Sequence, residues 1–338
     1  MKKKNILLLY GLVLLLFSDK VFAAQTQPGM PGDKHIIYFG RWDKSSSAQY
    51  VSYWGGAYLK VNFTGTTVKL IAGNKSNFYS RIDDGPWVSH LNGKDTIDLT
   101  AKPLPSGTHK LVIAQGKDYD YIFKFDGLVL DRGARTKKPK VSKKIVEYIG
   151  DSITTGYTDA QAEVSDYAWV AAEDLGVEHT QIAYPGVNLV TWPNKGNGTI
   201  IQYFKARSFK FQDSPDWNFK AYTPNVIVIN LGTNDNNNRV PDTVFQRVYI
   251  GLLTRVREQF PKAQIFALRT FLDLKTAPTI AAVKARNAAG DQKVHFIDTN
   301  GWLGPRKSDD YTDGLHPSIN GHKKAAELLE PIIAPYLH

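Results

Sequence analysis

An abrupt change in the pattern of apolar residues, near residue 140, is the feature that most limits the folds open to this chain. From Lys34 to Asp131, short runs rich in Val, Ile, Tyr and Phe often alternate with polar residues, which is typical of half-buried strands. Turn-forming residues separate these runs, which cover residues 56–63, 66–73, 78–83, 95–100, 109–116 and 121–130. Such regular short strands predict an all-β domain, a β-sandwich or jelly roll, over residues 34–132.

After residue 144, strands alternate with helices. Apolar runs predict strands at residues 145–149, 226–231, 263–268 and 295–298, and helical spacing predicts helices at residues 168–175, 240–260, 279–289 and 321–329. This alternation predicts an α/β domain over residues 145–338, with a parallel sheet covered by helices on both faces. The Lys- and Pro-rich stretch 133–144 is the expected linker. A chain of 338 residues is long enough for two such domains.

The first residues have the pattern of a targeting segment. Three lysines precede the apolar run 6–17, and small residues follow it at Ala23-Ala24. A run of this length falls short of the roughly 20 residues that span a bilayer. Residues 1–24 are therefore predicted to be a cleaved signal peptide, and the protein to be secreted or periplasmic, with no membrane span.

Composition excludes several classes of protein. The chain has no cysteine, which rules out disulfides, thiolate nucleophiles and Cys-ligated metals. The net charge of +10 is concentrated in part at residues 132–144. That stretch is interpreted as a solvated basic linker, although a contact with a polyanion has the same pattern. Because no zinc-finger spacing or groove-reading motif accompanies the charge, no nucleic-acid partner is expected.

Ser152 is the first candidate site residue. It lies in Gly150-Asp151-Ser152, directly after a predicted strand, where ligands bind in open α/β sheets. At the start of a helical turn its own N–H would point toward a developing oxyanion. The alternative is a helix N-cap, where Asp and Ser are common.

Three further segments have the same character. An aspartate three residues before a histidine, Asp313 and His316, can fold back to accept the Nδ1–H, which leaves Nε2 free to take a serine proton. The amide of Asn234, after the strand at residues 226–231, offers an oxyanion donor, and Gly186 lets a backbone N–H approach a ligand closely. Each segment alone also fits an ordinary turn or helix cap.

Taken in order, these segments resemble the four sequence blocks of the SGNH/GDSL hydrolases. The resemblance covers nearly all of the second domain and implies a flavodoxin-like parallel sheet in a three-layer αβα arrangement. It implies that Ser152 is the nucleophile and that His316, paired with Asp313, is the base. It also implies that Gly186 and Asn234 complete an oxyanion hole with the N–H of Ser152.

The front domain resembles the jelly-roll domain of carbohydrate esterase family 2, through residues 40–70 and the turn at residues 83–86. Members of that family pair such a domain with an SGNH domain and remove acetyl groups from plant polysaccharides, including those at 6-O positions. Some members lack the carboxylate partner of the histidine. Since this chain has Asp313, the resemblance implies a full Ser-His-Asp triad here.

These observations together predict an exported serine esterase that removes O-acetyl groups from a glucomannan- or xylan-type polysaccharide through an acetyl-enzyme. It is expected to act as a monomer. No metal-binding motif and no phosphate- or dinucleotide-binding loop is present, so neither a metal nor a cofactor is expected. Trp192 and Trp302 are candidates for stacking on a sugar ring, because indoles offer flat apolar faces, although large aromatics also fill cores.

Three alternatives remain open at this point. The same scaffold serves lipases and thioesterases, because fold does not fix function. The acetylated substrate can instead be a bacterial wall polymer or exopolysaccharide. Finally, a protein with an inactive hydrolase half would bind carbohydrate without releasing acetate, although the intact set of Ser, His, Asp, Gly and Asn argues against it.

Overall fold

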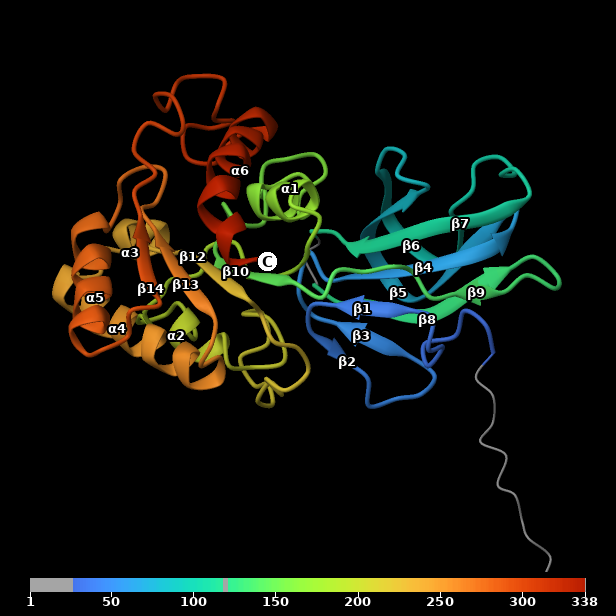
Figure 1. The fold of residues 1–338 in the computed structure, drawn as a ribbon, viewed down its shortest axis with the longest axis horizontal. Coiled ribbons are helices and arrows are strands. Elements are labelled where there is room, and N and C mark those ends of the chain that lie inside the picture. Colours follow the sequence, from blue (N-terminus) through green and yellow to red (C-terminus); the bar gives the residue numbers. More distant parts are fainter. Residues whose placement is uncertain (1–26, 118–120, 338) are drawn as a thin grey trace, which may run out of the picture.

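The protein consists of two domains, each built around one β-sheet, which lie side by side (Figure 1). The computed structural model describes residues 27–117 and 121–337, so the predicted signal peptide lies outside the described residues. The first sheet belongs to the front domain and contains only antiparallel pairs, whereas the second contains only parallel pairs. Both predicted fold classes are thereby confirmed.

The front domain has the strand order β1-β4-β7-β5-β8-β3-β2, with β6 added to β5 and β9 added to β4. The strands are β1 (Ile37–Phe39), β2 (Trp42–Asp43), β3 (Tyr50–Ser52), β4 (Tyr58–Gly65), β5 (Val68–Ile82), β6 (Val88–Asp98), β7 (Gly107–Gln115), β8 (Phe123–Leu130) and β9 (Thr136–Lys137). The sheet curls around a core of its own that includes Leu59, Phe63 and Phe123. β9 lies within the stretch expected to be a linker and pairs with β4.

Two predicted strands of the front domain are one strand in the structure. The runs at residues 66–73 and 78–83 join into β5, because the Asn74-Lys75 segment between them forms a bulge and not a turn. A bulge leaves extra residues unpaired but lets the strand continue with a stronger bend. β5 can therefore pair with β6, β7 and β8 along its length.

The second domain has the strand order β11-β10-β12-β13-β14. Its strands are β10 (Ile145–Gly150), β11 (Glu178–Ala183), β12 (Val226–Asn230), β13 (Gln264–Leu268) and β14 (Val294–Ile297). Its helices are α1 (Tyr167–Asp174), α2 (Thr199–Gln202), α3 (Thr233–Asn237), α4 (Asp242–Gln259), α5 (Thr276–Ala288) and α6 (Ile319–Ile333), followed by the short 3-10 helix η1 (Ala334–Tyr336). This order, 2-1-3-4-5 in chain sequence, is that of flavodoxin-like sheets, as expected.

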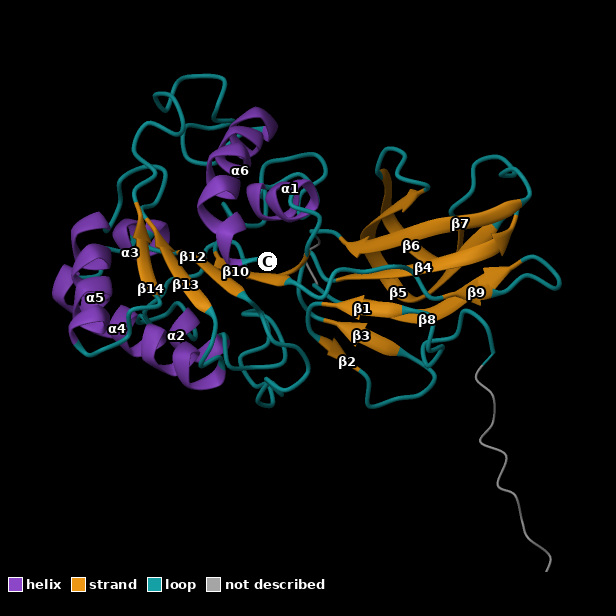
Figure 2. Ribbon diagram, in the orientation of Figure 1, coloured by secondary structure: helices purple, strands orange, loops and turns teal. Residues whose placement is uncertain are grey.

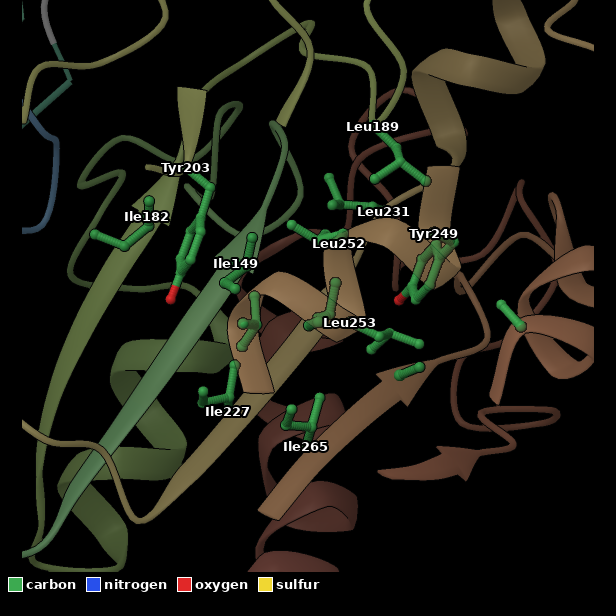
Figure 3. Close-up of a cluster of buried hydrophobic side chains, with 14 of the residues drawn as sticks. Ile149, Ile182, Leu189, Tyr203, Ile227, Leu231, Tyr249, Leu252, Leu253 and Ile265 are labelled. Atoms are coloured by element: carbon green, nitrogen blue, oxygen red, sulfur yellow. The ribbon is translucent and has the colours of Figure 1, made fainter. Parts of the chain in front are cut away.

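Helices cover both faces of the parallel sheet (Figure 2). In β12, Ile227 and Ile229 pack into the cluster beneath α4, whereas Val226 and Val228 pack into the cluster beneath α1 and α6. Figure 3 shows the first of these clusters, in which Ile227 and Ile265 from the sheet lie near Leu253 of α4. Because both faces of the strand are buried, its sequence is a continuous apolar run and not an alternating one.

Strand β11 was not predicted, because its sequence Glu-His-Thr-Gln-Ile-Ala is mostly polar. All six residues are nevertheless buried, since this edge of the parallel sheet lies against the front domain. Glu178 accepts hydrogen bonds from the Tyr58 hydroxyl at 2.7 Å and from Lys60 Nζ at 2.8 Å, and the ring of His179 stacks on that of Tyr58. Partners from the other domain thus satisfy polar groups that would otherwise be costly to bury.

Replacing Lys60 with methionine is expected to lower the free energy of unfolding by about 3 kcal/mol, because it leaves the Glu178 carboxylate buried without its cation. The side chain of Glu178 is only 3% exposed and that of Lys60 is 29% exposed. Urea denaturation followed by circular dichroism measures the effect. The matched control is Lys69→Met, which breaks an exposed pair with Asp98 at 3.9 Å and should cost less than about 1 kcal/mol. Equal losses in the two variants would contradict the prediction.

Other buried contacts also join the two domains. The guanidinium of Arg41, in the front domain, donates to the backbone oxygens of Tyr203 and Lys205 at 2.6 and 2.7 Å. Trp54 Nε1 donates to the Ala206 oxygen at 2.9 Å, and its indole belongs to the core cluster of the second domain. Across residues 27–117 and 121–337, no helix is both long and apolar enough to cross a membrane.

Candidate active site

The topology of the parallel sheet brings three of the predicted segments to one edge. Gly150 at the end of β10 is level with Ala183 of β11 on one side and with Asn230 of β12 on the other. The chain leaves β10 toward β11 and returns to β12 on the opposite side, which makes this the switch point where open α/β sheets bind ligands. Ser152 and Gly186 follow these strand ends within three residues.

Ser152 lies in a tight turn and not at the start of a helix. Hydrogen-bonded turns begin at Ser152, and residues 151–166 form only turns and bends, with no helix until Tyr167. The Asp151 side chain accepts a hydrogen bond from the Ile153 N–H at 3.0 Å, and its backbone oxygen accepts from the Thr154 N–H at 3.1 Å. A Cβ on Gly150 would lie 2.0 Å from Thr154 Oγ1, so the turn requires glycine there.

A chain of hydrogen bonds connects Asp313, His316 and Ser152. His316 Nε2 lies 2.9 Å from Ser152 Oγ, and His316 Nδ1 lies 2.8 Å from Asp313 Oδ2. Because the carboxylate can only accept, Nδ1 carries the proton, and Nε2 accepts from the serine hydroxyl. This is the arrangement in which an imidazole can act as general base toward a serine.

The environment of Asp313 keeps it ionised. Its partial burial alone would raise the pKa, but hydrogen bonds from the His316 N–H, the His316 ring and the Leu315 N–H outweigh this and hold the pKa of the carboxyl below its usual range. An anionic Asp313 stabilises the positive charge that His316 would acquire on taking a proton. The buried His322 does not compete as a base, since burial lowers its pKa to about 3.

The loop that carries His316 has little regular structure. Residues 298–318, between β14 and α6, form turns and bends, with one isolated bridge between Tyr311 and Pro317. The Thr312 N–H donates to the His316 oxygen at 2.9 Å, and the Ser318 N–H donates to the Asp310 oxygen at 2.8 Å. These bonds hold the backbone of the loop, whereas the imidazole ring packs against the ring of Tyr157, with 5.5 Å between their centroids.

Asn234 lies beside the nucleophile turn. Its Nδ2 donates to Asp151 Oδ2 at 3.2 Å, and Asp151 directly precedes Ser152. Gly186 is exposed and has a φ of +81°, a conformation that glycine adopts without strain. Hydrogen bonds connect the segments of Asn234 and Gly186, since the Asp235 carboxylate accepts hydrogen bonds from the N–H groups of Leu189 and Val190 at 2.8 and 3.1 Å.

Burial disfavours the charged form of two aspartates at this edge of the sheet. It raises the pKa of Asp151 to about 7 and that of Asp235 to about 6, in each case against hydrogen bonds from neighbouring N–H groups that favour the anion. Sequence reasoning did not assign a role to Asp151, Asp235 or Tyr157. The first two had a signal, since each adjoins a predicted site residue, but the packing of Tyr157 on His316 had none.

The two tryptophans predicted to bind sugar lie apart. Trp192 is partly buried and packs against the hydrophobic cluster beneath α4. Trp302 packs against the cluster on the opposite face of the sheet, with its ring 6.3 Å from that of Phe271. The two indoles therefore do not form one shared platform, and their role in sugar binding stays a prediction.

No group of three or more His, Asp or Glu side chains within the described ranges is arranged to hold a metal ion. The groups at the candidate site are a hydroxyl, an imidazole, a carboxylate and amide donors. This set suits transfer of an acyl group through the serine hydroxyl.

Two family models match the chain. Residues 148–324 match the GDSL-like Lipase/Acylhydrolase family, and residues 38–139 match the Carbohydrate esterase 2 N-terminal family. The first match spans more than half of the chain and contains Ser152, Gly186, Asn234, Asp313 and His316.

Among relatives, Cellulase/esterase CelE of Acetivibrio thermocellus is 29% identical over 317 residues, covering 87% of this chain. The chain spans only 38% of the length of that protein. An acetylxylan esterase / glucomannan deacetylase of Cellvibrio japonicus is 25% identical over 256 residues, covering 68% of each protein.

The solved structure of a family two carbohydrate esterase from Clostridium thermocellum, in complex with cellohexaose, has a TM-score of 0.79 and 28% identity. The match covers 89% of this chain and 99% of that one, so both domains and their arrangement are shared. This chain belongs to the GDSL-like lipase/acylhydrolase family, and its front domain matches the N-terminal domain of carbohydrate esterase family 2.

Proposed function

We propose that this protein is an exported serine esterase that removes O-acetyl groups from polysaccharide. The observation that carries the proposal is the hydrogen-bonded chain from Asp313 through His316 to Ser152, at the edge of the sheet where such folds bind ligands. The relatives support an acetyl ester of xylan or glucomannan as the substrate, because two of them are named acetylxylan esterase / glucomannan deacetylase. Action at 6-O positions is part of the proposal through the resemblance of the front domain to carbohydrate esterase family 2.

The reaction proceeds in two acyl-transfer steps. The Ser152 hydroxyl attacks the acetyl carbonyl while His316 Nε2 takes its proton. The tetrahedral oxyanion is stabilised by the N–H groups of Ser152 and Gly186 and by the Asn234 amide. The bond between the acetyl carbon and the sugar oxygen then breaks, and the sugar oxygen leaves with the proton from His316.

Water completes the cycle. His316 takes a proton from a water molecule, which attacks the acetyl-enzyme, and the second tetrahedral intermediate collapses to acetate with the proton returned to Ser152. Asp313 keeps the imidazole in the tautomer and orientation that both steps need. The proposed cycle transfers only an acyl group and protons, so no atom changes its oxidation state.

Residues 34–132 and 145–338 are the proposed domains, connected by the basic stretch 133–144, and residues 1–24 the proposed signal peptide. Export fits a polymeric substrate, since a polysaccharide acetylated in a cell wall lies outside the cytoplasm. The proposed enzyme acts as a monomer. One chain carries the complete set of proposed site residues: Ser152, His316, Asp313, Gly186 and Asn234.

Acetate release from a panel of acetylated polymers tests the proposal. We expect release from glucomannan and xylan and little from peptidoglycan. We also expect 4-nitrophenyl esters longer than about four carbons to be poor substrates, because a small acyl pocket discriminates by chain length. Coupled acetate assays and ester hydrolysis rates supply the two measurements.

Each alternative has its own outcome. Faster hydrolysis of octanoate than acetate would indicate a lipase or thioesterase, and acetate release from peptidoglycan alone would indicate a wall deacetylase. Binding of glycan with no ester hydrolysis at all would indicate a carbohydrate-binding protein and would contradict the proposed activity.

A further inference from the structure

One side chain of the front domain reaches the candidate active site. Lys117 lies two residues after the end of β7, and its Nζ donates a hydrogen bond to the backbone oxygen of Tyr157 at 2.6 Å. The same ammonium group lies 4.0 Å from the centroid of the Tyr157 ring. A cation at this distance over an aromatic face is attracted by the ring quadrupole, so Lys117 holds both the backbone and the ring of Tyr157.

Tyr157 in turn contacts both members of the candidate nucleophile–base pair. Its N–H donates to the Ser152 oxygen at 3.1 Å, which closes the turn that carries the nucleophile. Its ring packs against the ring of His316 at 5.5 Å between centroids, with 44° between the planes. The tyrosine therefore lies between the front domain and the imidazole.

The ring of Tyr157 supports the imidazole from the side. It projects from the irregular loop at residues 298–318, and its partner Asp313 has a side chain that is 46% exposed. Hydrogen bonds fix the backbone of this loop, but among the described residues Tyr157 is the aromatic side chain in contact with the His316 ring. Its position thus limits rotation of the ring away from Ser152.

A second contact reaches the neighbouring loop. The ring of Tyr121, just before β8, packs at 4.8 Å from the ring of Tyr184, which lies two residues before Gly186. The β7 and β8 ends of the front domain thus contact the loops that follow both β10 and β11. This edge of the front domain contacts the candidate site as well as the side of the parallel sheet.

We propose that Lys117 is a positioning residue for the esterase reaction, which holds Tyr157 against His316 so that Nε2 stays within reach of the Ser152 hydroxyl. The inference rests on the proposed function. It makes the front domain a contributor to the rate of the chemical step, through a contact that crosses the domain boundary.

Steady-state hydrolysis of 4-nitrophenyl acetate by the full chain tests this inference. Lys117→Met is expected to lower kcat about 10-fold, because small misplacements of a catalytic group are costly, while KM changes by less than about twofold. Lys117→Arg should recover most of the lost kcat, since a guanidinium also donates hydrogen bonds and lies over aromatic rings. Lys75→Met, at an exposed lysine of β5, is the matched control and should match the wild type.

A double-mutant cycle separates positioning from a general loss of structure. In a Tyr157→Leu background, which has already lost the ring, Lys117→Met should lower kcat much less than in the wild type. Equal effects in both backgrounds, or an unchanged kcat in Lys117→Met, would overturn the proposal. Failure of the proposed function looks different, because Ser152→Ala would then retain the wild-type rate. Failure of the positioning role alone would give additive effects of the two substitutions in an enzyme that still depends on Ser152.

Discussion

Ser152→Ala is expected to lower kcat for acetate release by about 10⁴- to 10⁶-fold while the protein stays folded. Loss of the nucleophile in a serine hydrolase removes the covalent route, and only binding and oxyanion stabilisation remain. Ser152 is only 6% exposed, and alanine fits the same space without strain. The measurement is the rate of acetate release from acetylated xylan, together with the thermal midpoint, which should move by less than about 3 °C.

His316→Ala provides a matched comparison, because the two residues are proposed to act as one unit. The double variant should be no slower than either single variant, since groups that act together are strongly non-additive. Acetate release by Ser152→Ala at more than a few per cent of the wild-type rate, with the fold intact, would remove Ser152 from the mechanism.

Asn234→Ala should lower kcat by about 10²- to 10³-fold and change KM little, because an oxyanion donor acts on charge that develops only in the transition state. Its amide lies beside the nucleophile turn, where it donates to Asp151 at 3.2 Å. Steady-state kinetics with 4-nitrophenyl acetate separates kcat from KM.

Asn237→Ala is the control for that prediction, since it removes an exposed amide from the same short helix. It should retain the wild-type kcat. A similar loss in both variants would mean that α3 and not the Asn234 amide was disturbed, and a loss confined to KM would assign Asn234 to substrate binding.

Sequence reasoning succeeded where a single segment contains its own signal. The aspartate and histidine at positions 313 and 316 lie within one turn, so their contact follows from local spacing. The continuous apolar run of β12 indicated a strand buried on both faces, which the structure confirms. The order of strands then places the ends of β10 and β12 side by side.

It failed where the deciding partner lies in the other domain. β11 is too polar to be recognised as a buried strand, because Tyr58 and Lys60 supply the groups that make its burial possible. The contact between Lys117 and Tyr157 likewise depends on how the domains dock, and the pattern of apolar residues in the sequence does not indicate this. The two halves of β5 were predicted as separate strands because polar residues interrupt the apolar pattern between them, whereas the structure continues the strand through a bulge.

The polar edge strand β11, which the front domain covers, has a consequence for any attempt to express the second domain alone. A second domain expressed alone would expose the Glu178 carboxylate and the His179 ring, which contact the front domain, and an uncovered edge strand favours self-association. Fusion designs should therefore keep the two domains together and confine insertions to the surface away from their interface.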